Sequence, residues 1–153
     1  MTTPPVMARL RAGVVTHSAE AMRALATEVA AALPRDCTLA LHGDLGVGKT
    51  TFVQGLAAGL GIRGPVTSPT FNIFSLHRGP VTLVHLDAYR LESPQQVEDL
   101  LLADFLVSPW VLAVEWPERI AGWLPADTVH LELGINPDQG HSVRLHPSTD
   151  SPR

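Results

Sequence analysis

A phosphate-binding pattern is present in one short segment, which reads Gly43-Asp44-Leu45-Gly46-Val47-Gly48-Lys49-Thr50. It fits the spacing Gly, four residues, Gly, Lys and then Ser or Thr. Glycines let the backbone approach a phosphate closely, and successive N–H groups then form an anion-binding nest. We expect Lys49 to reach the β- and γ-phosphates of a nucleotide and the Thr50 hydroxyl to hold Mg²⁺.

The flanking segments have the character that such a loop requires. Residues 38–42 read as a short buried strand, and residues 51–60 read as a helix. The apolar residues of that helix fall on one face: Phe52, Val53, Leu56, Ala57 and Leu60. A strand, a glycine-rich loop and a helix in this order favour a nucleotide site over a chance Lys-Thr in a turn.

Two carboxylates stand where apolar strands are expected to end. Asp87 follows the segment 81–86, and Glu115 follows the fully apolar segment 110–114. If both strands share a sheet with residues 38–42, both acids arrive beside the phosphate loop, where they can serve a metal ion or an attacking water. The alternative is that each acid is solvated or caps a loop.

Three further groups have both a functional and a structural interpretation. Ser68-Pro69-Thr70 fits a loop that senses the γ-phosphate, or a plain turn before a strand. Trp116 either covers the nucleotide or packs in the core. Tyr89 and Arg90 either bind a partner or a phosphate, or are an exposed aromatic and a solvated charge.

The remaining chain predicts an alternation of helices and strands. Residues 1–12 read as a loose lead-in, and a helix capped by Thr16 or Ser18 runs to about Leu33. Further strands are expected within 71–77, antiparallel to 81–86, and at 129–133 and 142–145, with a turn at 136–140. A capping box at 93–96 starts a helix that reaches about residue 102, and a short helix covers 117–123. We expect one domain over residues 1–146 and a disordered polar tail at 147–153.

Composition disfavours several classes of protein, among them nucleic-acid-binding, membrane-spanning and secreted proteins. The chain has 153 residues and a formal net charge of −4, with no basic run, so autonomous nucleic-acid binding is disfavoured. Nothing in the sequence approaches a membrane-spanning apolar run, and the N-terminus lacks a signal-peptide core. The lone Cys37 fits a reducing cytoplasm and a buried apolar position. The seven scattered histidines read as surface or strand-end residues rather than zinc ligands.

The segments taken together resemble one family. The likeness is carried by four segments: the phosphate loop, Ser68-Pro69-Thr70-Phe71, His85-Leu86-Asp87-Ala88-Tyr89-Arg90-Leu91 and Val114-Glu115-Trp116-Pro117. In order and spacing they resemble the bacterial tRNA threonylcarbamoyladenosine biosynthesis ATPases of the TsaE family. Many NTPases share the loop, whereas the Asp-x-Tyr-Arg-Leu and Glu-Trp-Pro segments make the likeness specific.

The resemblance implies an α/β fold of the P-loop NTPase type, with a mixed sheet flanked by helices. It implies a weak Mg²⁺-dependent ATPase, stimulated by TsaB- and TsaD-like partners that modify adenosine 37 of tRNA, so that tRNA is met through the complex. It implies that Lys49 and the loop, with Thr51, bind ATP and that Thr50 and Glu115 hold Mg²⁺. Asp87 is then expected to assist the metal or the water, Thr70 to belong to a switch segment, and Trp116 to lie beside the site.

The chain departs from the family at two places, and two rival functions remain. Met22 stands where a Thr is frequent, and Gly140-His141 stands where Gly-Arg is frequent, and both regions are expected near the base and ribose. A small-molecule kinase is one rival, although Arg63, Arg78 and Arg90 do not form an arginine-bearing lid in the sequence. A nucleotide-dependent switch with little hydrolysis is the other.

Overall fold

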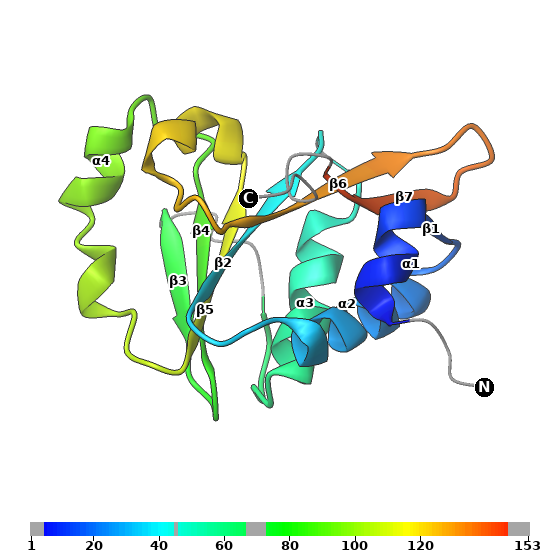
Figure 1. The fold of residues 1–153 in the computed structure, drawn as a ribbon, viewed down its shortest axis with the longest axis horizontal. Coiled ribbons are helices and arrows are strands. Elements are labelled where there is room, and N and C mark those ends of the chain that lie inside the picture. The colour runs from blue at the N-terminus through cyan, green and yellow to red at the C-terminus, as the bar shows by residue number, and fades with distance from the viewer. Residues whose placement is uncertain (1–4, 45, 67–72, 147–153) are drawn as a thin grey trace.

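A computed structural model describes residues 5–44, 46–66 and 73–146, and Figure 1 shows a twisted sheet with helices on both faces. The strands are β1 (Val14–Thr16), β2 (Cys37–His42), β3 (Phe74–His77), β4 (Thr82–Asp87), β5 (Trp110–Glu115), β6 (Val129–Ile135) and β7 (His141–Leu145). Within the described residues they form one seven-stranded sheet in the order β1-β7-β6-β2-β5-β4-β3.

The centre of the sheet is parallel and its edges are antiparallel. Strand β2 pairs in parallel with β5 and with β6, and β5 pairs in parallel with β4. Strand β3 is antiparallel to β4, β7 is antiparallel to β6, and β1 is antiparallel to β7. The expected mixed sheet is confirmed. Because β2, β5 and β4 run the same way, their carboxyl ends meet at one edge, where ligands bind in open α/β sheets.

Helices cover the two faces of the sheet unequally. Helices α1 (Val6–Ala12), α2 (Ala19–Ala32) and α3 (Lys49–Gly59) pack on one face. Helix α4 (Pro94–Asp99) and the 3₁₀ segments η1 (Leu102–Asp104) and η2 (Pro117–Trp123) pack on the other. The strands alternate between the two cores, so that Leu83 packs with the first group and Val84 with the second.

The helix after the phosphate loop is held against α2 by close backbone contact. A Cβ on Gly55 would lie 2.3 Å from the carbonyl oxygen of Arg23, so only glycine fits there. The Thr27 hydroxyl, on α2, donates to the Gly55 carbonyl at 3.0 Å. This packing fixes the position of α3 and therefore of the loop that begins it.

Most of the predicted elements are confirmed, and the N-terminal prediction is wrong. The predicted lead-in contains α1, because Val6 and Leu10 are buried and give a short helix an apolar side to pack. Strand β1 was not expected; it is three residues long and adds to the edge of the sheet by pairing with β7. The predicted tail at 147–153 lies outside the described residues.

Two predicted caps have different outcomes. Ser18 caps α2 as expected, since its Oγ accepts a bond from the N–H of Ala21 at 3.0 Å. The capping box at 93–96 is not formed: Ser93 makes no side-chain cap bond, and the Gln96 side chain accepts from the N–H of Glu92 instead. Helix α4 ends at Asp99, earlier than predicted, and Leu101 then adopts a left-handed conformation before η1.

Within the described ranges, no helix combines the length and apolar character needed to span a bilayer.

Candidate nucleotide-binding site

The phosphate loop lies between β2 and α3, as predicted. Gly43 follows the last residue of β2 and has a φ of 142°, and Gly48 caps α3 with a φ of 103°. Both values lie in the region that favours glycine. A Cβ on Gly43 would lie 2.6 Å from the carbonyl oxygen of Leu133, so this position also needs glycine for space. Leu45 lies outside the described residues.

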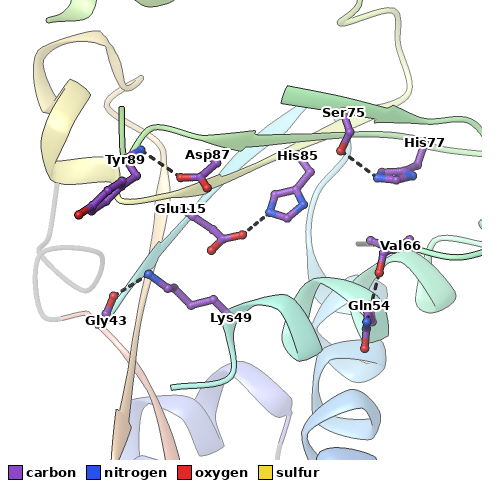
Figure 2. A network of polar contacts seen from close by, with 10 residues as sticks. All are labelled: Gly43, Lys49, Gln54, Val66, Ser75, His77, His85, Asp87, Tyr89 and Glu115. Carbon is purple, nitrogen blue, oxygen red and sulfur yellow. Dashed lines mark hydrogen bonds and ion pairs between the residues drawn. The ribbon is translucent and has the colours of Figure 1, made fainter. Parts of the chain in front are cut away.

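Lys49, the only lysine in the sequence, is the first residue of α3 and is 5% exposed. Its Nζ donates to the carbonyl oxygen of Gly43 at 2.6 Å and lies 3.9 Å from the centroid of the Trp116 ring (Figure 2 shows the first contact). Burial lowers the pKa of Lys49, and the nearby carboxylates of Glu115, Glu118, Asp87 and Asp44 oppose this shift. A buried ammonium whose positive charge is only partly balanced by nearby carboxylates is suited to attract a phosphate.

The two predicted carboxylates are neighbours on adjacent strands. Asp87, the last residue of β4, is paired in register with Glu115, the last residue of β5. Asp87 is oriented by the backbone N–H of Tyr89, which donates to its Oδ1 at 3.0 Å. Glu115 is 5% exposed, and its Oε2 lies 2.5 Å from Nε2 of His85 (Figure 2). Each acid is therefore held in place by a hydrogen bond.

One cavity collects most of the predicted site. Its volume is about 330 Å³. It is lined by Gly46, Gly48, Lys49, Thr50, Thr51, Asp87, Glu115 and Trp116. Hydroxyl and carboxylate oxygens are the donors that Mg²⁺ takes, and this ion is commonly held by one or two carboxylates together with substrate phosphates. Among the described residues no group of three His, Cys, Asp or Glu side chains is placed to hold a metal.

Trp116 lies beside the site, as predicted, in an unusual backbone conformation. Its φ of 57° is in the left-handed region, which is rare for a bulky residue and is found at sites that other contacts hold in place. Its ring packs against Tyr89, with the ring centroids 5.1 Å apart, and the Arg119 guanidinium lies 5.4 Å from the Tyr89 ring centroid. Trp116 therefore borders the lysine end of the cavity, and Tyr89 packs against the Trp116 ring.

A second, smaller cavity adjoins the loop on the side of α2. Its volume is about 180 Å³. It is lined by Thr16, His17, Ser18, Ala19, Met22, Gly48, Thr51, Gln139 and His141. Met22 and His141, which were expected near the base and ribose, both line this cavity. His141 Nδ1 lies 2.9 Å from the carbonyl oxygen of Val47, which can only accept, so this nitrogen carries the proton.

One predicted segment lies outside the described residues, and the interpretation of the histidines as surface or strand-end residues is wrong for His85. The switch segment Ser68-Pro69-Thr70 lies outside the described residues. The histidines are not all surface or strand-end residues, because His85 lies inside β4 and is fully buried. A signal for His85 was present: it stands two residues before Asp87, and alternate residues of a strand face the same side.

Fold and site define an α/β protein of the P-loop NTPase-like class, with a phosphate loop facing two strand-end carboxylates. A model of the family described as "Threonylcarbamoyl adenosine biosynthesis protein TsaE" matches residues 16–143. The chain belongs to the TsaE family.

Individual relatives agree with this assignment. The tRNA threonylcarbamoyladenosine biosynthesis protein TsaE of Treponema pallidum is 37% identical over 86% of this chain and 97% of its own length. The protein of the same name from Streptomyces coelicolor is 44% identical over 73% of this chain and 78% of its own. The solved structure described as "Crystal structure of Bacillus subtilus YdiB" superposes with a TM-score of 0.73 and 31% identity, covering 87% of this chain and 82% of that one.

Proposed function

We propose that this chain is a Mg²⁺-dependent ATPase that hydrolyses ATP to ADP and phosphate. In this proposal it is the energising subunit of the complex that forms N6-threonylcarbamoyladenosine at position 37 of tRNAs reading codons that begin with A. The observation that carries the proposal is that Lys49, Asp87 and Glu115 surround one cavity in a chain of the TsaE family.

The loop and Lys49 bind the phosphates. The Gly46 and Gly48 backbone, which lines the cavity, supplies N–H donors, and the N-terminus of α3 adds its positive dipole end. Lys49 exchanges its bond to the Gly43 carbonyl for a phosphate oxygen, because a charged acceptor binds an ammonium more strongly than a neutral one does.

The carboxylates serve the metal and the attacking water. Thr50 and Glu115 would hold Mg²⁺, which when bound neutralises charge on the phosphate oxygens. Asp87, with one oxygen held by the N–H of Tyr89, uses the other to assist the metal or to orient the water. Trp116 lies over Lys49 and helps to exclude bulk water from the reacting phosphate.

The base and ribose lie in the second cavity. It adjoins Gly48 and Thr51 of the phosphate loop and is lined by Met22 and His141. Since Nδ1 of His141 donates to Val47, its Nε2 is the acceptor of this ring. The cavity therefore combines an apolar thioether with polar atoms, as nucleoside sites do.

The proposed partners are TsaB- and TsaD-like proteins, and the proposed compartment is the cytoplasm. A formal net charge of −4 without a basic run makes direct, strong binding of tRNA unfavourable. The chain then meets tRNA through its partners.

The test is ATP hydrolysis by the purified chain, alone and with its TsaB- and TsaD-like partners, in Mg²⁺ and then in EDTA. We expect slow turnover that requires Mg²⁺ and rises with the partners. Nucleotide binding without phosphate release under every condition would favour the switch. Phosphate transfer only when a small acceptor is added would favour the kinase, although no arginine among the described residues lines the cavity.

Lys49→Ala is expected to abolish nucleotide binding or turnover, because no other described lining residue of the cavity supplies a positive charge to the phosphates. Hydrolysis and ATP affinity are measured side by side. Arg78→Ala, which removes an exposed cation away from the cavity, is the matched control and should behave as the unmodified chain. Ordinary ATPase activity in Lys49→Ala would overturn the phosphate-loop assignment.

A further inference from the structure

His85 is a fully buried imidazole that the chemistry described above does not use. It lies on β4, two residues before Asp87, and both side chains point to the sheet face that packs under α3, as Leu83 does. Its Nε2 lies 2.5 Å from Oε2 of Glu115, which stands on the neighbouring strand two residues beyond Ala113, the register partner of His85. Figure 2 shows the two side chains directed toward each other.

The hydrogen-bond pattern assigns the position of the proton. A carboxylate only accepts hydrogen bonds, so Nε2 of His85 donates to Glu115. The opposite ring atom, Nδ1, is the one buried side-chain nitrogen or oxygen within the described residues that has no partner. A proton on Nδ1 would be a buried donor without an acceptor, which is costly, so the ring carries its hydrogen on Nε2.

We propose that His85 is a positioning residue that fixes the Glu115 carboxylate for Mg²⁺ through the hydrogen bond that its Nε2 donates. One oxygen of Glu115 is engaged by the imidazole, and the carboxylate has a second oxygen with which to reach the cavity. A lysine or arginine in this place would also orient the carboxylate, but it would compete electrostatically with the cation. The inference rests on the proposed Mg²⁺ role of Glu115.

The expected loss of Mg²⁺ affinity on removing the His85 hydrogen bond can be estimated from metal sites in other proteins. Hydrogen-bond partners behind a metal ligand typically change metal affinity or activity by about 10- to 100-fold when removed. The imidazole is also part of the packed core, so its removal has a structural cost that must be separated from its effect on the metal.

The first measurement uses the metal-free and nucleotide-free chain. Long-range ¹H–¹⁵N spectra of histidine-labelled protein report which ring nitrogen is protonated, and the His85 signals are assigned by their loss in His85→Gln. We expect the tautomer protonated on Nε2, with a slowly exchanging N–H. A ring protonated on Nδ1 alone, with no hydrogen on Nε2, would overturn the proposal, whether or not the protein hydrolyses ATP.

The second measurement compares three variants by the affinity for Mg²⁺ at saturating ADP and the affinity for ADP in EDTA. His85→Phe fills the space without a donor, and His85→Gln retains an N–H near the position of Nε2. His77→Phe is the matched control, because His77 lies on the adjacent strand and contacts Ser75 rather than Glu115. Thermal unfolding of each variant measures the structural cost.

We expect His85→Phe to weaken Mg²⁺ binding by about 10-fold or more and ADP binding in EDTA by no more than about twofold. His85→Gln should recover Mg²⁺ affinity to within about threefold of the unmodified chain. His77→Phe should have the same Mg²⁺ affinity as the unmodified chain. Equal losses in His85→Phe and His85→Gln, or unchanged Mg²⁺ affinity in His85→Phe, would overturn the proposal. If Mg²⁺ has no effect on ADP binding in the unmodified chain, the proposed metal role fails first and this inference fails with it.

Discussion

His85 and the histidine cluster formed by His42, His130 and His146 place the same side chain in opposite surroundings. His85 is buried against a carboxylate on the sheet face covered by α3. In the cluster, Nε2 of His42 lies 2.8 Å from Nδ1 of His130, and the rings of His42 and His146 stack with centroids 5.3 Å apart. His42 follows Leu41, which packs under α3, so the cluster lies on the other face of the sheet.

The neighbours give the two regions different chemistry. Burial, and then the nearby His146, lowers the pKa of His42, and burial followed by His42 and His146 lowers the pKa of His130. Burial, together with neighbouring imidazoles, therefore makes His42 and His130 resist protonation, whereas Nε2 of His146 in the same cluster lies 3.2 Å from Oε1 of Glu132. An imidazole beside a carboxylate has a permanent acceptor for its N–H and can hold that carboxylate in place. The residue type alone thus predicts neither role.

The largest expected effect comes from removing the carboxylate partner. Glu115→Ala should lower Mg²⁺-dependent turnover by about 100-fold or more and change nucleotide binding in EDTA far less. It also leaves the buried N–H of His85 without an acceptor, which should cost about 1–3 kcal/mol of unfolding free energy. Hydrolysis kinetics and chemical denaturation measure the two effects.

Glu98→Ala, which removes an exposed carboxylate from α4, is the control for this substitution and should change neither quantity. An unchanged Mg²⁺ requirement in Glu115→Ala would move the metal role to Asp87. It would also remove the functional distinction between the two histidine regions.

The intermediate effect is a pH dependence of stability in the histidine cluster. Because the folded-state pKa values of His42 and His130 lie below the ordinary value of 6.5, the unfolded chain binds protons first as the pH falls. Stability should therefore decrease as the pH drops below about 6.5, by at most about 1.4 kcal/mol per pH unit for each proton. His130→Asn should make this decrease shallower, as measured by chemical denaturation between pH 7 and pH 5.

His17→Asn is the matched control, because His17 is exposed and lies outside the cluster. It should retain the slope of the unmodified chain. Parallel slopes for His130→Asn and the unmodified chain would show that the cluster does not couple protonation to folding.

The smallest expected effect is at Cys37, at the start of β2. The reactivity of its thiol reports whether the Glu115 and His130 variants are folded. Burial, followed by the charge of Asp127, raises the pKa of the Cys37 thiol to about 11, so at pH 8 about one thiol in a thousand is the reactive thiolate. Labelling by a thiol reagent should be slow. Rates within about twofold of each other in the Glu115 and His130 variants would indicate native packing at β2, and a large acceleration would indicate unfolding.

Local features of the sequence predicted most of the elements but not all of their ends. The apolar face of α3 and the alternation of β6 were readable because each is encoded by neighbouring residues. Helix α1 and strand β1 were missed because they are short and gain their stability from α2 and β7 rather than from their own sequences. The end of α4 was misplaced because tertiary packing of Leu102 draws the chain into η1.

By itself the sequence determined the phosphate loop, the strand before it, the helix after it, and the two acids at strand ends. These depend on steric and capping rules that act between adjacent residues. Only the tertiary structure decided that β5 lies between β2 and β4, which brings Asp87 beside Glu115. It also decided that His85 meets an acid 30 residues along the chain and that His42, His130 and His146 meet one another. Strand order and register pair residues that are distant in sequence, and no local pattern encodes those pairs.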